Sequence, residues 1–334
     1  MRIGRSFIMV LLAVVLGACA MAVPAMPPVT SEAGARLQAD MTYLAGPALR
    51  GRLTGTAGND SAAAFIARRY AELRMQPVFD DQCSGRPACG KTFLQPFHLS
   101  RTTLDRLDVS IRSTTQNVGG VVTGTDSTLK REYVVVGAHY DHIGPSNTYA
   151  LDAGAFPMMH LGADDNASGT VAVLELARRL AQHPARRSVV FLNFSAEELG
   201  LIGSEFFVEN SPLPVGDIIT MVNLDMVGRL RGDRLILFTG GANRRFRQIV
   251  DSVDKVPPAL DFHLVWESAG RERSDLMSFA DVHVPVISAF TDYHPGYHRA
   301  GDVAARINFQ GLEKVVDLTE RVVRALADGN ARPN

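Results

Sequence analysis

Residues 133–142 read Tyr-Val-Val-Val-Gly-Ala-His-Tyr-Asp-His, a continuous apolar run that ends in two histidines and an aspartate. Such a run is typical of a strand buried on both faces of a sheet. Further runs of this kind occupy residues 188–194, 218–224, 235–239 and 285–290. Apolar residues at helical spacing occupy residues 167–183, 197–210 and 312–326. Strands that alternate with helices predict an α/β fold, with a mostly parallel central β-sheet and helices on both faces.

Acidic residues and histidines follow these strands where each strand ends. The carboxyl ends of parallel strands share one edge of a sheet, and binding sites form beyond that edge. The blocks are His-Tyr-Asp-His at 139–142, Gly-Ala-Asp-Asp-Asn-Ala-Ser-Gly at 162–169, Ser-Ala-Glu-Glu-Leu-Gly at 195–200, Asn-Leu-Asp at 223–225 and Tyr-His-Pro-Gly-Tyr-His at 293–298. Their placement predicts one cleft that collects them all.

So many carboxylates in one cleft require cations between them, because neighbouring like charges disfavour ionisation. Mixed nitrogen and oxygen ligands suit zinc. Two zinc ions about 3.5–4 Å apart that share one bridging carboxylate would balance the charge. Three other chemistries lack their motifs, since the sequence contains no G-x-S-x-G, no H-E-x-x-H and no P-loop.

The composition excludes other classes of protein. The chain has 34 Lys+Arg against 35 Asp+Glu, and this net charge of −1 excludes a nucleic-acid binder that relies on bulk positive charge. A content of 46% hydrophobic and 21% charged residues excludes wholesale disorder. Three cysteines are too few for a disulfide scaffold or a cysteine-rich zinc module. A globular enzyme or binding protein remains.

The blocks resemble those of the co-catalytic di-zinc exopeptidases of metallopeptidase clan MH, the relatives of aminopeptidase Y, bacterial secreted leucyl aminopeptidase and glutamate carboxypeptidase. Asp-Asp-Asn-Ala-Ser-Gly at 164–169 together with Ala-Glu-Glu-Leu-Gly at 196–200 is highly specific. The resemblance runs from about Leu49 to Leu326 and leaves no room for the protease-associated domain of some relatives. It includes Ser-Asp at 274–275, where relatives often continue with histidine and this chain has Leu276.

The resemblance implies a role for each residue of the centre. The implied ligands are Asp165, which bridges the two zinc ions, His139 and Asp225 on one ion, and Glu198 and His298 on the other. Asp141 orients the His139 ring. Glu197 is the general base that takes a proton from the water between the metals. We expect the two glutamates on a helix, where adjacent residues point about 100° apart, so that one ligates and the other faces the water.

Other polar residues near the cleft have weaker assignments. Four are expected in the substrate site: Ser274, Asp275, His294 and Tyr297. His294 also competes with His298 as a ligand, although the preceding tyrosine favours His298. His142 and His160 flank the cleft and are interpreted as loop residues. At the predicted helix N-termini, Ser31 is placed to cap the first helix, and either Asn59 or Asp60 is placed to cap the second.

The implied activity is hydrolysis of peptide bonds in peptide substrates, and an aminopeptidase that releases N-terminal residues is the leading hypothesis. Arg271 and Arg273 precede Ser274 and offer a site for a C-terminal carboxylate, which would make the chain a dipeptidase or carboxypeptidase of the same fold. A glutaminyl-peptide cyclotransferase is a more distant alternative, but its single zinc needs no five-ligand set. A non-catalytic relative is another, and the intact ligands with Glu197 argue against it.

The first residues are typical of an export signal. Arg2 and Arg5 precede an apolar run at 7–16, which is too short to span a bilayer and has the length of a signal-peptide core. The Leu-Gly-Ala-Cys that ends at Cys19 resembles a bacterial lipobox. We therefore predict a signal peptide at 1–18, a lipidated Cys19 and Pro-rich tether at 19–30, and a single peptidase domain at 31–334. Residue 20 is alanine and not the aspartate that often retains lipoproteins at the inner membrane, which favours the outer membrane facing the periplasm. Ordinary signal cleavage would instead leave a soluble periplasmic or secreted protein.

Cys83 and Cys89 remain as a pair if Cys19 carries lipid. The turn-like segment between them makes a disulfide sterically plausible. Closing so small a loop would stabilise the fold by roughly 2 kcal/mol on the chain-entropy model. The alternative is two free thiols in a surface loop, which an oxidising compartment disfavours.

Overall fold

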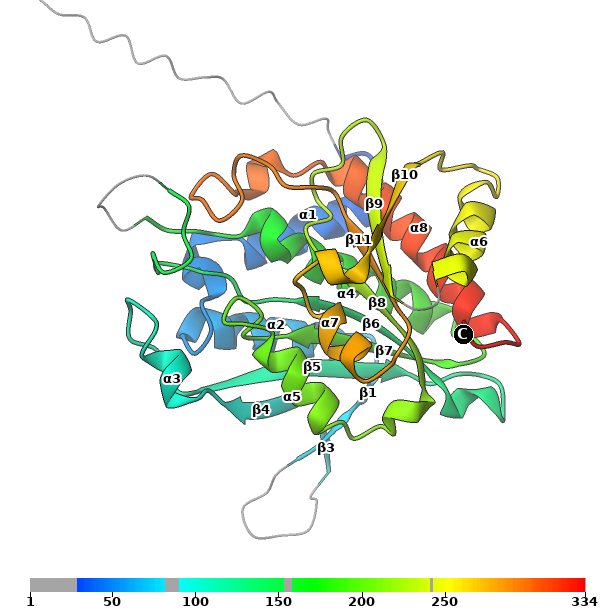
Figure 1. Cartoon of the computed structure of the whole chain (residues 1–334), viewed down its shortest axis with the longest axis horizontal. Helices are drawn as coiled ribbons and strands as arrows, with labels where there is room; N and C mark the ends of the chain where they lie inside the picture. Colours follow the sequence, from blue (N-terminus) through cyan, green and yellow to red (C-terminus); the bar gives the residue numbers. More distant parts are fainter. Residues whose placement is uncertain (1–28, 82–89, 153–157, 241–242, 334) are drawn as a thin grey trace, which may run out of the picture.

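The computed structural model describes residues 29–81, 90–152, 158–240 and 243–333 (Figure 1). The predicted signal peptide, Cys19, and the Cys83–Cys89 pair lie outside the described residues. Across the described residues, the helices are all too short or too polar to cross a bilayer.

A nine-stranded sheet with the order β1-β5-β7-β6-β8-β11-β9-β10 forms the centre, with β4 paired to β5. Its strands are β1 (Gln76–Pro77), β4 (Leu94–His98), β5 (Thr114–Val122), β6 (Tyr133–His139), β7 (Ser188–Phe194), β8 (Ile218–Leu224), β9 (Arg234–Gly240), β10 (His263–Ser268) and β11 (Val286–Phe290). A separate two-stranded sheet pairs β2 (Phe79–Asp80) with β3 (Lys91–Thr92).

The four middle strands β7, β6, β8 and β11 are mutually parallel, so their carboxyl ends share one edge. Strand β9 is antiparallel to β11 and parallel to β10, and the other margin, with β5, β4 and β1, is antiparallel. The predicted α/β fold with a mostly parallel central sheet is confirmed, because the pairings among the four middle strands are all parallel.

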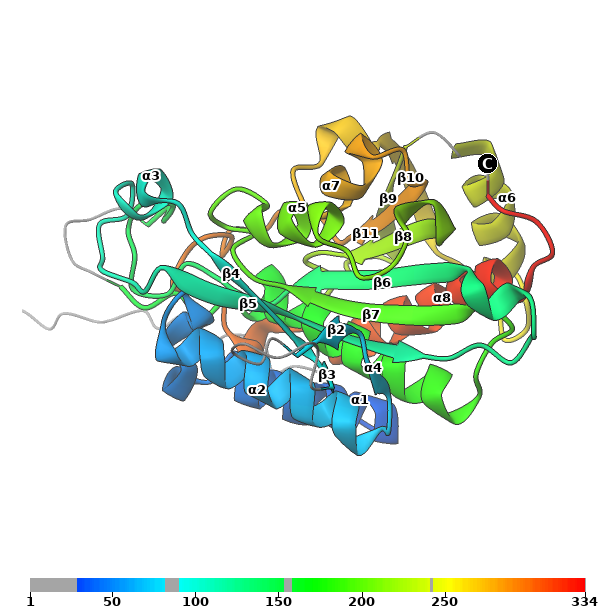
Figure 2. The same ribbon diagram turned by 90° about the horizontal axis from the view of Figure 1, so that it is seen from below.

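Helices cover both faces of the sheet, as predicted (Figure 2). One face carries α1 (Glu32–Leu44), α2 (Ala57–Glu72), α4 (Gly169–Gln182) and α8 (Phe309–Asp328), with α6 (Asn243–Asp254) against α8. The opposite face carries α5 (Ile202–Glu209) and α7 (Leu276–Asp281), and the short α3 (Arg101–Leu104) lies beyond the end of β4.

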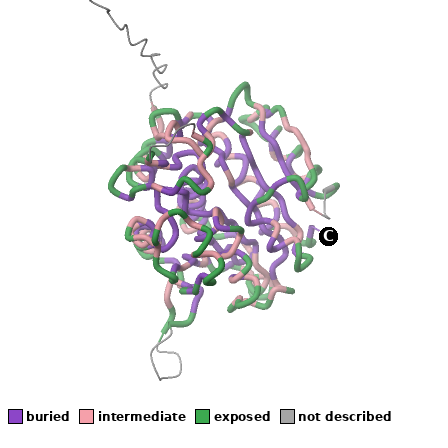
Figure 3. Tube along the Cα trace, turned by 60° about the vertical axis from the view of Figure 1, so that its left-hand side comes forward, coloured by how far each residue is buried: buried purple, intermediate pink, exposed green. Residues whose placement is uncertain are grey.

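The middle strands read as continuous apolar runs because each face of the sheet has its own core. In β6, Val134 and Val136 pack into the cluster beneath α1, α2, α4 and α8, whereas Val135 packs with Phe194 and Phe207 on the α5–α7 side. Buried residues run through the centre of the molecule, and exposed residues gather at its periphery (Figure 3). A strand with no solvent-facing side shows no polar alternation.

The start of the first helix is confirmed, and that of the second is corrected. The Ser31 hydroxyl accepts from the Gly34 backbone N–H at 2.8 Å and caps α1. The cap of α2 is Thr56, whose extended backbone precedes Ala57, rather than Asn59 or Asp60. Asn59 lies within the first turn and is fully buried, where its amide donates to the Arg52 carbonyl.

Candidate metal centre

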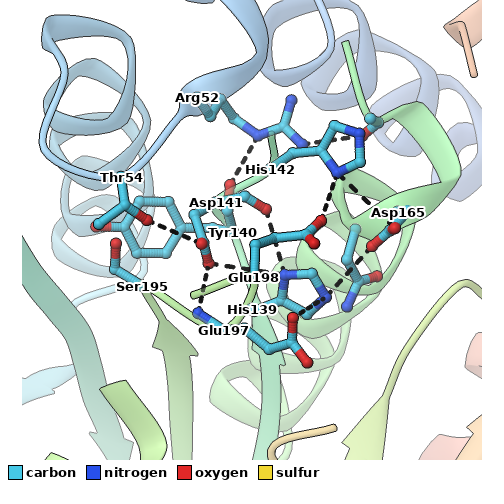
Figure 4. A network of polar contacts seen from close by, with 12 residues as sticks. Arg52, Thr54, His139, Tyr140, Asp141, His142, Asp165, Ser195, Glu197 and Glu198 are labelled. Atoms are coloured by element: carbon cyan, nitrogen blue, oxygen red, sulfur yellow. Dashed lines mark hydrogen bonds and ion pairs between the residues drawn. The ribbon is translucent and has the colours of Figure 1, made fainter. Parts of the chain in front are cut away.

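Ligand-type side chains converge from the ends of the four middle strands. Figure 4 shows His139, Asp165, Glu197 and Glu198 among them. His139 is the last residue of β6, Glu197 and Glu198 follow β7, and Asp225 directly follows β8. Asp165 lies in the 163–168 segment before α4, and His298 lies in the loop after β11. The structure thus brings together all the residues expected as ligands or base.

Asp165 faces two separate groups of side chains. Its Oδ1 lies 3.5 Å from His139 Nε2, which is also 3.6 Å from Asp225 Oδ1. Its Oδ2 lies 3.1 Å from His298 Nε2, which is also 3.1 Å from Glu198 Oε2. One carboxylate therefore belongs to both groups, as a bridging ligand between two cations requires.

Both histidines are oriented through their second nitrogen. His139 Nδ1 lies 3.2 Å from the Asp141 carbonyl oxygen, and His298 Nδ1 lies 2.9 Å from the Tyr149 carbonyl oxygen. A carbonyl only accepts, so these contacts place the proton of a neutral ring on Nδ1 and leave the Nε2 lone pair directed at the carboxylates. Metal-binding histidines have this arrangement.

The donor set fits zinc. Asp225 Oδ1 is buried and has no hydrogen-bond partner within the described part of the chain. A buried carboxylate oxygen without a donor is costly, and a cation beside it removes that cost. Imidazole nitrogens and carboxylate oxygens are also the ligands of zinc in hydrolases.

The carboxylates around His139 and His298 need positive charge beside them. Burial disfavours the charged form of His298, but Glu198 and Asp165 outweigh it and raise its pKa to about 12. Burial likewise opposes ionisation of Glu198, yet the His298 and His142 rings hold its pKa well below the usual range. Burial also opposes a charge on His139, and Glu197 with Asp141 and Asp225 raises the pKa of that ring well above its usual value. Protons or metal ions must therefore occupy this cluster of carboxylates.

Glu197 and Glu198 lie in a turn and not on the helix that was expected there. Helix α5 begins at Ile202, and the turn before it carries left-handed backbone at Ala196 (φ 61°) and Leu201 (φ 63°). The turn separates the two carboxylates: Glu198 faces His298, whereas Glu197 Oε2 lies 3.9 Å from His139 Nε2. Burial, together with Glu198 and Asp275, raises the pKa of Glu197 well above that of a free glutamate, against the opposing effect of His139.

Asp141 holds this turn against the end of β6. Its Oδ1 accepts from the Glu197 backbone N–H at 3.2 Å, and its Oδ2 accepts from the Thr54 hydroxyl at 2.9 Å. Asp141 Oδ1 also lies 3.7 Å from His139 Nδ1. The fully buried Asp141 thus ties a ligand-type histidine to the general-base segment.

His142, interpreted from sequence as a loop residue, lies within the centre. Its Nδ1 is 2.7 Å from Glu198 Oε1 and 3.8 Å from Asp165 Oδ2 (Figure 4). Its position three residues after His139 in an acidic block was the available signal. His160, in contrast, bonds the Gly144 carbonyl and Asp152 and has no contact with the ligand groups.

A buried arginine and a buried aspartate hold the loops that carry the ligands. The fully buried Arg52 donates to the carbonyls of Leu44, Tyr140, Leu161 and Gly162. Asp302 accepts from the backbone N–H groups of Asp164 and Asp165 at 2.9–3.0 Å. Neither residue was expected at the centre, although Arg52 belongs to the Arg-Gly-Arg sequence at 50–52 that is shared with the clan MH exopeptidases.

The segment before α4 is also pinned to the end of β8. The Asn166 amide donates to the Leu224 carbonyl at 2.9 Å and accepts from the Met226 N–H at 3.2 Å. Gly169 approaches the same strand so closely that a Cβ atom would lie 2.2 Å from the Leu224 carbonyl oxygen. Only glycine fits at this contact.

A pocket of about 500 Å³ opens beside the ligand groups. Its wall is apolar and aromatic at Met226, Phe238, Phe290, Tyr293 and Tyr297, and charged at Arg271, Glu272 and Arg273. Tyr297 stacks on His298 with ring centroids 4.0 Å apart.

Of the four residues expected in the substrate site, only Tyr297 lines this pocket. Ser274 is buried and accepts from the Asn223 amide, and Asp275 is buried beneath the cleft. His294 Nε2 lies 3.2 Å from Asp164 Oδ2, so this histidine braces the loop before α4 and is directed away from the ligand groups. Its burial against Asp164 is the physical reason why it does not compete with His298.

Residues 117–323 match the family model described as peptidase family M28. The aminopeptidase YwaD of Bacillus subtilis is 26% identical over 68% of this chain and 48% of its own length. A probable zinc metalloprotease of Pyrenophora tritici-repentis is 36% identical over 36% of this chain and 23% of its own length. The chain thus matches less than half of the length of these curated relatives.

Solved structures share the fold. The zinc aminopeptidase BSAP from Bacillus subtilis superposes with a TM-score of 0.67 at 18% identity, over 90% of this chain and 97% of its own. A Zn-dependent exopeptidase from Parabacteroides distasonis also gives a TM-score of 0.67, at 19% identity, over 92% of this chain and all of its own. At such identities the likeness extends to the fold alone.

Proposed function

The chain belongs to peptidase family M28, and from this membership we propose that it is a zinc-dependent exopeptidase that releases residues from the free amino terminus of peptides. One observation carries the proposal. Asp165 presents each carboxylate oxygen to a separate histidine–carboxylate group, and the Glu197 carboxylate stands beside them at the mouth of a pocket.

Two zinc ions per chain are part of the proposal. Asp165 would hold both, His139 and Asp225 one of them, and Glu198 and His298 the other. When bound, the metals would polarise the scissile carbonyl and neutralise the developing negative charge. His142 would fix Glu198 through their 2.7 Å contact.

Glu197 acts as the general base in this proposal. It would accept a proton from the attacking water and return that proton to the leaving amine. Its raised pKa suits the first step, because a carboxylate with a raised pKa is a stronger proton acceptor than a free glutamate. The Asp141 contact to its backbone N–H keeps the carboxylate at the pocket mouth.

Arg273 supports a second candidate, a dipeptidase or carboxypeptidase. It is exposed and lines the pocket, so its guanidinium is available to a substrate carboxylate. The other rim arginine, Arg271, donates to Glu267 at 2.9 Å and is already paired. A carboxylate site is strongest when two donors grip the carboxylate together. Because Arg271 is already paired, Arg273 alone would have to hold a substrate carboxylate, and we therefore favour the aminopeptidase.

A substrate panel tests the two candidates. We expect the metal-loaded protein to hydrolyse aminoacyl-4-nitroanilides and to leave their N-acetylated forms intact. Cleavage of free dipeptides or of N-blocked peptides from the carboxyl end, without release of nitroaniline, would favour the second candidate.

We also propose that the protein is exported and anchored by lipid at Cys19, on the outer membrane facing the periplasm. The apolar segment at 7–16 and the Leu-Gly-Ala-Cys sequence support this location. A Cys83–Cys89 disulfide is consistent with the same compartment.

A further inference from the structure

The pocket beside the ligand groups contains a carboxylate that the proposed mechanism does not use. Glu272 lines this pocket and is only 9% exposed. Its Oε1 accepts from the Ser288 hydroxyl at 2.8 Å. Its Oε2 is buried and, within the described ranges, has no hydrogen-bond partner. A buried carboxylate oxygen without a donor costs free energy, and such a group usually has a partner supplied from elsewhere.

Ser288 fixes Glu272 at a defined depth. Ser288 lies on β11 opposite Asn223 of β8, and the Asn223 amide donates to the hydroxyls of Ser288 and Ser274. Asn223 precedes Asp225 by two residues, which at about 3.3 Å per residue is roughly 7 Å along the strand. The Glu272 anchor is therefore well beneath the ligand groups, towards the floor of the pocket.

Among the residues that the structure describes, no Lys, Arg or His side chain neutralises the Glu272 carboxylate. Burial first, and then Asp225 and Asp275, raise the pKa of Glu272 well above its usual value, and the groups that act on it include no described Lys, Arg or His side chain. Arg271 is paired with Glu267, and Arg273 is exposed at the rim. With no such partner in the described part of the chain, a cation that enters the pocket is suited to pair with the ionised carboxylate.

We propose that Glu272 binds the side-chain cation of a lysine or arginine at the amino terminus of the substrate, so that this peptidase prefers basic N-terminal residues. The proposal rests on the aminopeptidase function given above. Met226, Phe238 and Phe290 provide apolar walls for the aliphatic stem, and Glu272 meets the charge at its end.

The α-ammonium group of a peptide is the other cation to consider. It is bonded to the carbon next to the scissile carbonyl, so it must remain close to the ligand groups when that carbonyl is attacked. Glu272 is anchored roughly 7 Å further along the strand direction. The depth therefore favours a side-chain cation.

The experiment compares lysyl, arginyl and norleucyl 4-nitroanilides, because norleucine has a similar unbranched stem without the charge. We expect the wild-type enzyme to have a higher kcat/KM for the two basic substrates. Glu272→Gln should lower kcat/KM for these by about 10²-fold, as loss of one partner of a desolvated charge pair does, and change norleucyl hydrolysis by less than about threefold. Glu209→Gln, the matched control, removes one charge from the exposed surface of α5 and should leave kcat/KM unchanged for the basic and the norleucyl substrates.

A binding measurement separates the two proposals. Lysinamide should raise the melting temperature of the metal-loaded wild type more than norleucinamide does, and Glu272→Gln should abolish that difference. A wild type that binds and discriminates these amides but cleaves no nitroanilide would overturn the aminopeptidase function alone. Equal losses for lysyl and norleucyl substrates in Glu272→Gln, or a wild-type preference for norleucine, would overturn the role of Glu272. If Glu272→Gln does not fold, Ser288→Ala should show the same selective loss to a smaller degree.

Discussion

Glu197 and Glu198 are neighbours in the chain, but their carboxylates have different surroundings. Both line the pocket, but Glu198 contacts two histidines at 2.7 and 3.1 Å, whereas Glu197 is 3.9 Å from its nearest histidine nitrogen. The pKa of Glu198 is lowered and that of Glu197 is raised. A carboxylate that stays ionised suits a ligand, and one whose pKa is raised suits proton transfer.

Substitution of the two glutamates separates these roles. In Glu197→Gln the amide cannot accept a proton, so we expect kcat to fall by about 10²–10⁴-fold while the zinc content stays unchanged. Glu198→Gln should instead lose zinc, and excess zinc should restore part of the activity. Steady-state kinetics and metal analysis of both variants test this. Loss of zinc in Glu197→Gln with retention in Glu198→Gln would reverse the assignment.

Asp302 is a positioning residue for the bridging carboxylate. Asp302→Ala leaves the buried N–H groups of Asp164 and Asp165 without an acceptor, which should cost at least about 2 kcal/mol of unfolding free energy. The loosened Asp165 should weaken zinc affinity by about 10–100-fold, as loss of an outer partner does. Urea unfolding and competitive zinc titration measure the two effects. Asp233→Asn, at an exposed salt bridge with Lys314, is the control and should change neither.

At the scale of elements, the junction of β6, α1 and the loop before α4 depends on one buried guanidinium. Arg52 donates to carbonyls from all three, including Leu44, Tyr140 and Gly162. Burial lowers the pKa of Arg52 to about 10, and acidic groups such as Asp141 and Asp302 partly offset this. Because the Arg52 guanidinium donates to carbonyls of three chain segments, it fixes the positions of these segments relative to one another.

Arg52→Lys keeps the charge but loses the planar fork of donors. One ammonium group cannot reach all these carbonyls, so we expect a loss of about 2–4 kcal/mol of unfolding free energy. Chemical denaturation of the metal-free protein gives this value without the contribution of zinc. Arg50→Lys, two residues away and exposed, should leave the stability unchanged within error. If Arg52→Lys lost no more unfolding free energy than Arg50→Lys, the bracing role of Arg52 would be contradicted.

The elements that the sequence predicts well are those with their own periodic signal. Strands β7 and β8 lie at the predicted residues 188–194 and 218–224, because burial on both faces produces uninterrupted apolar runs. Strand β5 was not predicted, since its Thr114–Val122 sequence mixes polar residues and two glycines. The sequence predicts helix at 197–201, where the structure has a turn, because the left-handed positions of this turn are occupied by Ala196 and Leu201, which carry no sequence signal for that conformation.

The centre itself was predictable from the motifs, except for its long-range partners. His139, Asp165 and Asp225 follow apolar strands or precede a helix in distinctive blocks. Arg52 and Asp302 owe their positions to contacts between segments far apart in the sequence, such as the 137-residue separation of Asp302 and Asp165. No local pattern encodes such contacts.

At the scale of the whole molecule, zinc should contribute to stability as well as to activity. Metal that binds only the folded chain stabilises it by about 4 kcal/mol when free zinc is 1,000 times its Kd. We therefore expect a chelator to abolish hydrolysis and lower the melting temperature, and zinc to restore both with about two ions per chain. Calorimetry with metal analysis measures this. Full activity at one ion per chain would favour a single-zinc mechanism.

The location of the molecule has its own test. Cys19→Ser removes the proposed lipid-bearing thiol, and we expect the protein to move from the detergent phase to the aqueous phase on phase separation. Hydrolysis by the purified protein should stay the same. Unchanged partitioning would leave ordinary signal cleavage as the interpretation.

The order of the ligands along the chain has a consequence for biosynthesis. The two ligand groups need side chains from His139 through to His298, supplied by four adjacent strand ends. A chain that emerges from the ribosome with its amino terminus first can assemble His139, Asp165 and Asp225 once β8 has been made, but it cannot complete the group of Glu198 and His298 until the segment after β11 has joined the sheet. Completion of the second ligand group is therefore one of the last events in the folding of this chain, and the proposed pair of zinc ions could be held only after it. The ions that fill the centre are those present where the finished chain folds, and for an exported chain that place is beyond the cytoplasmic membrane.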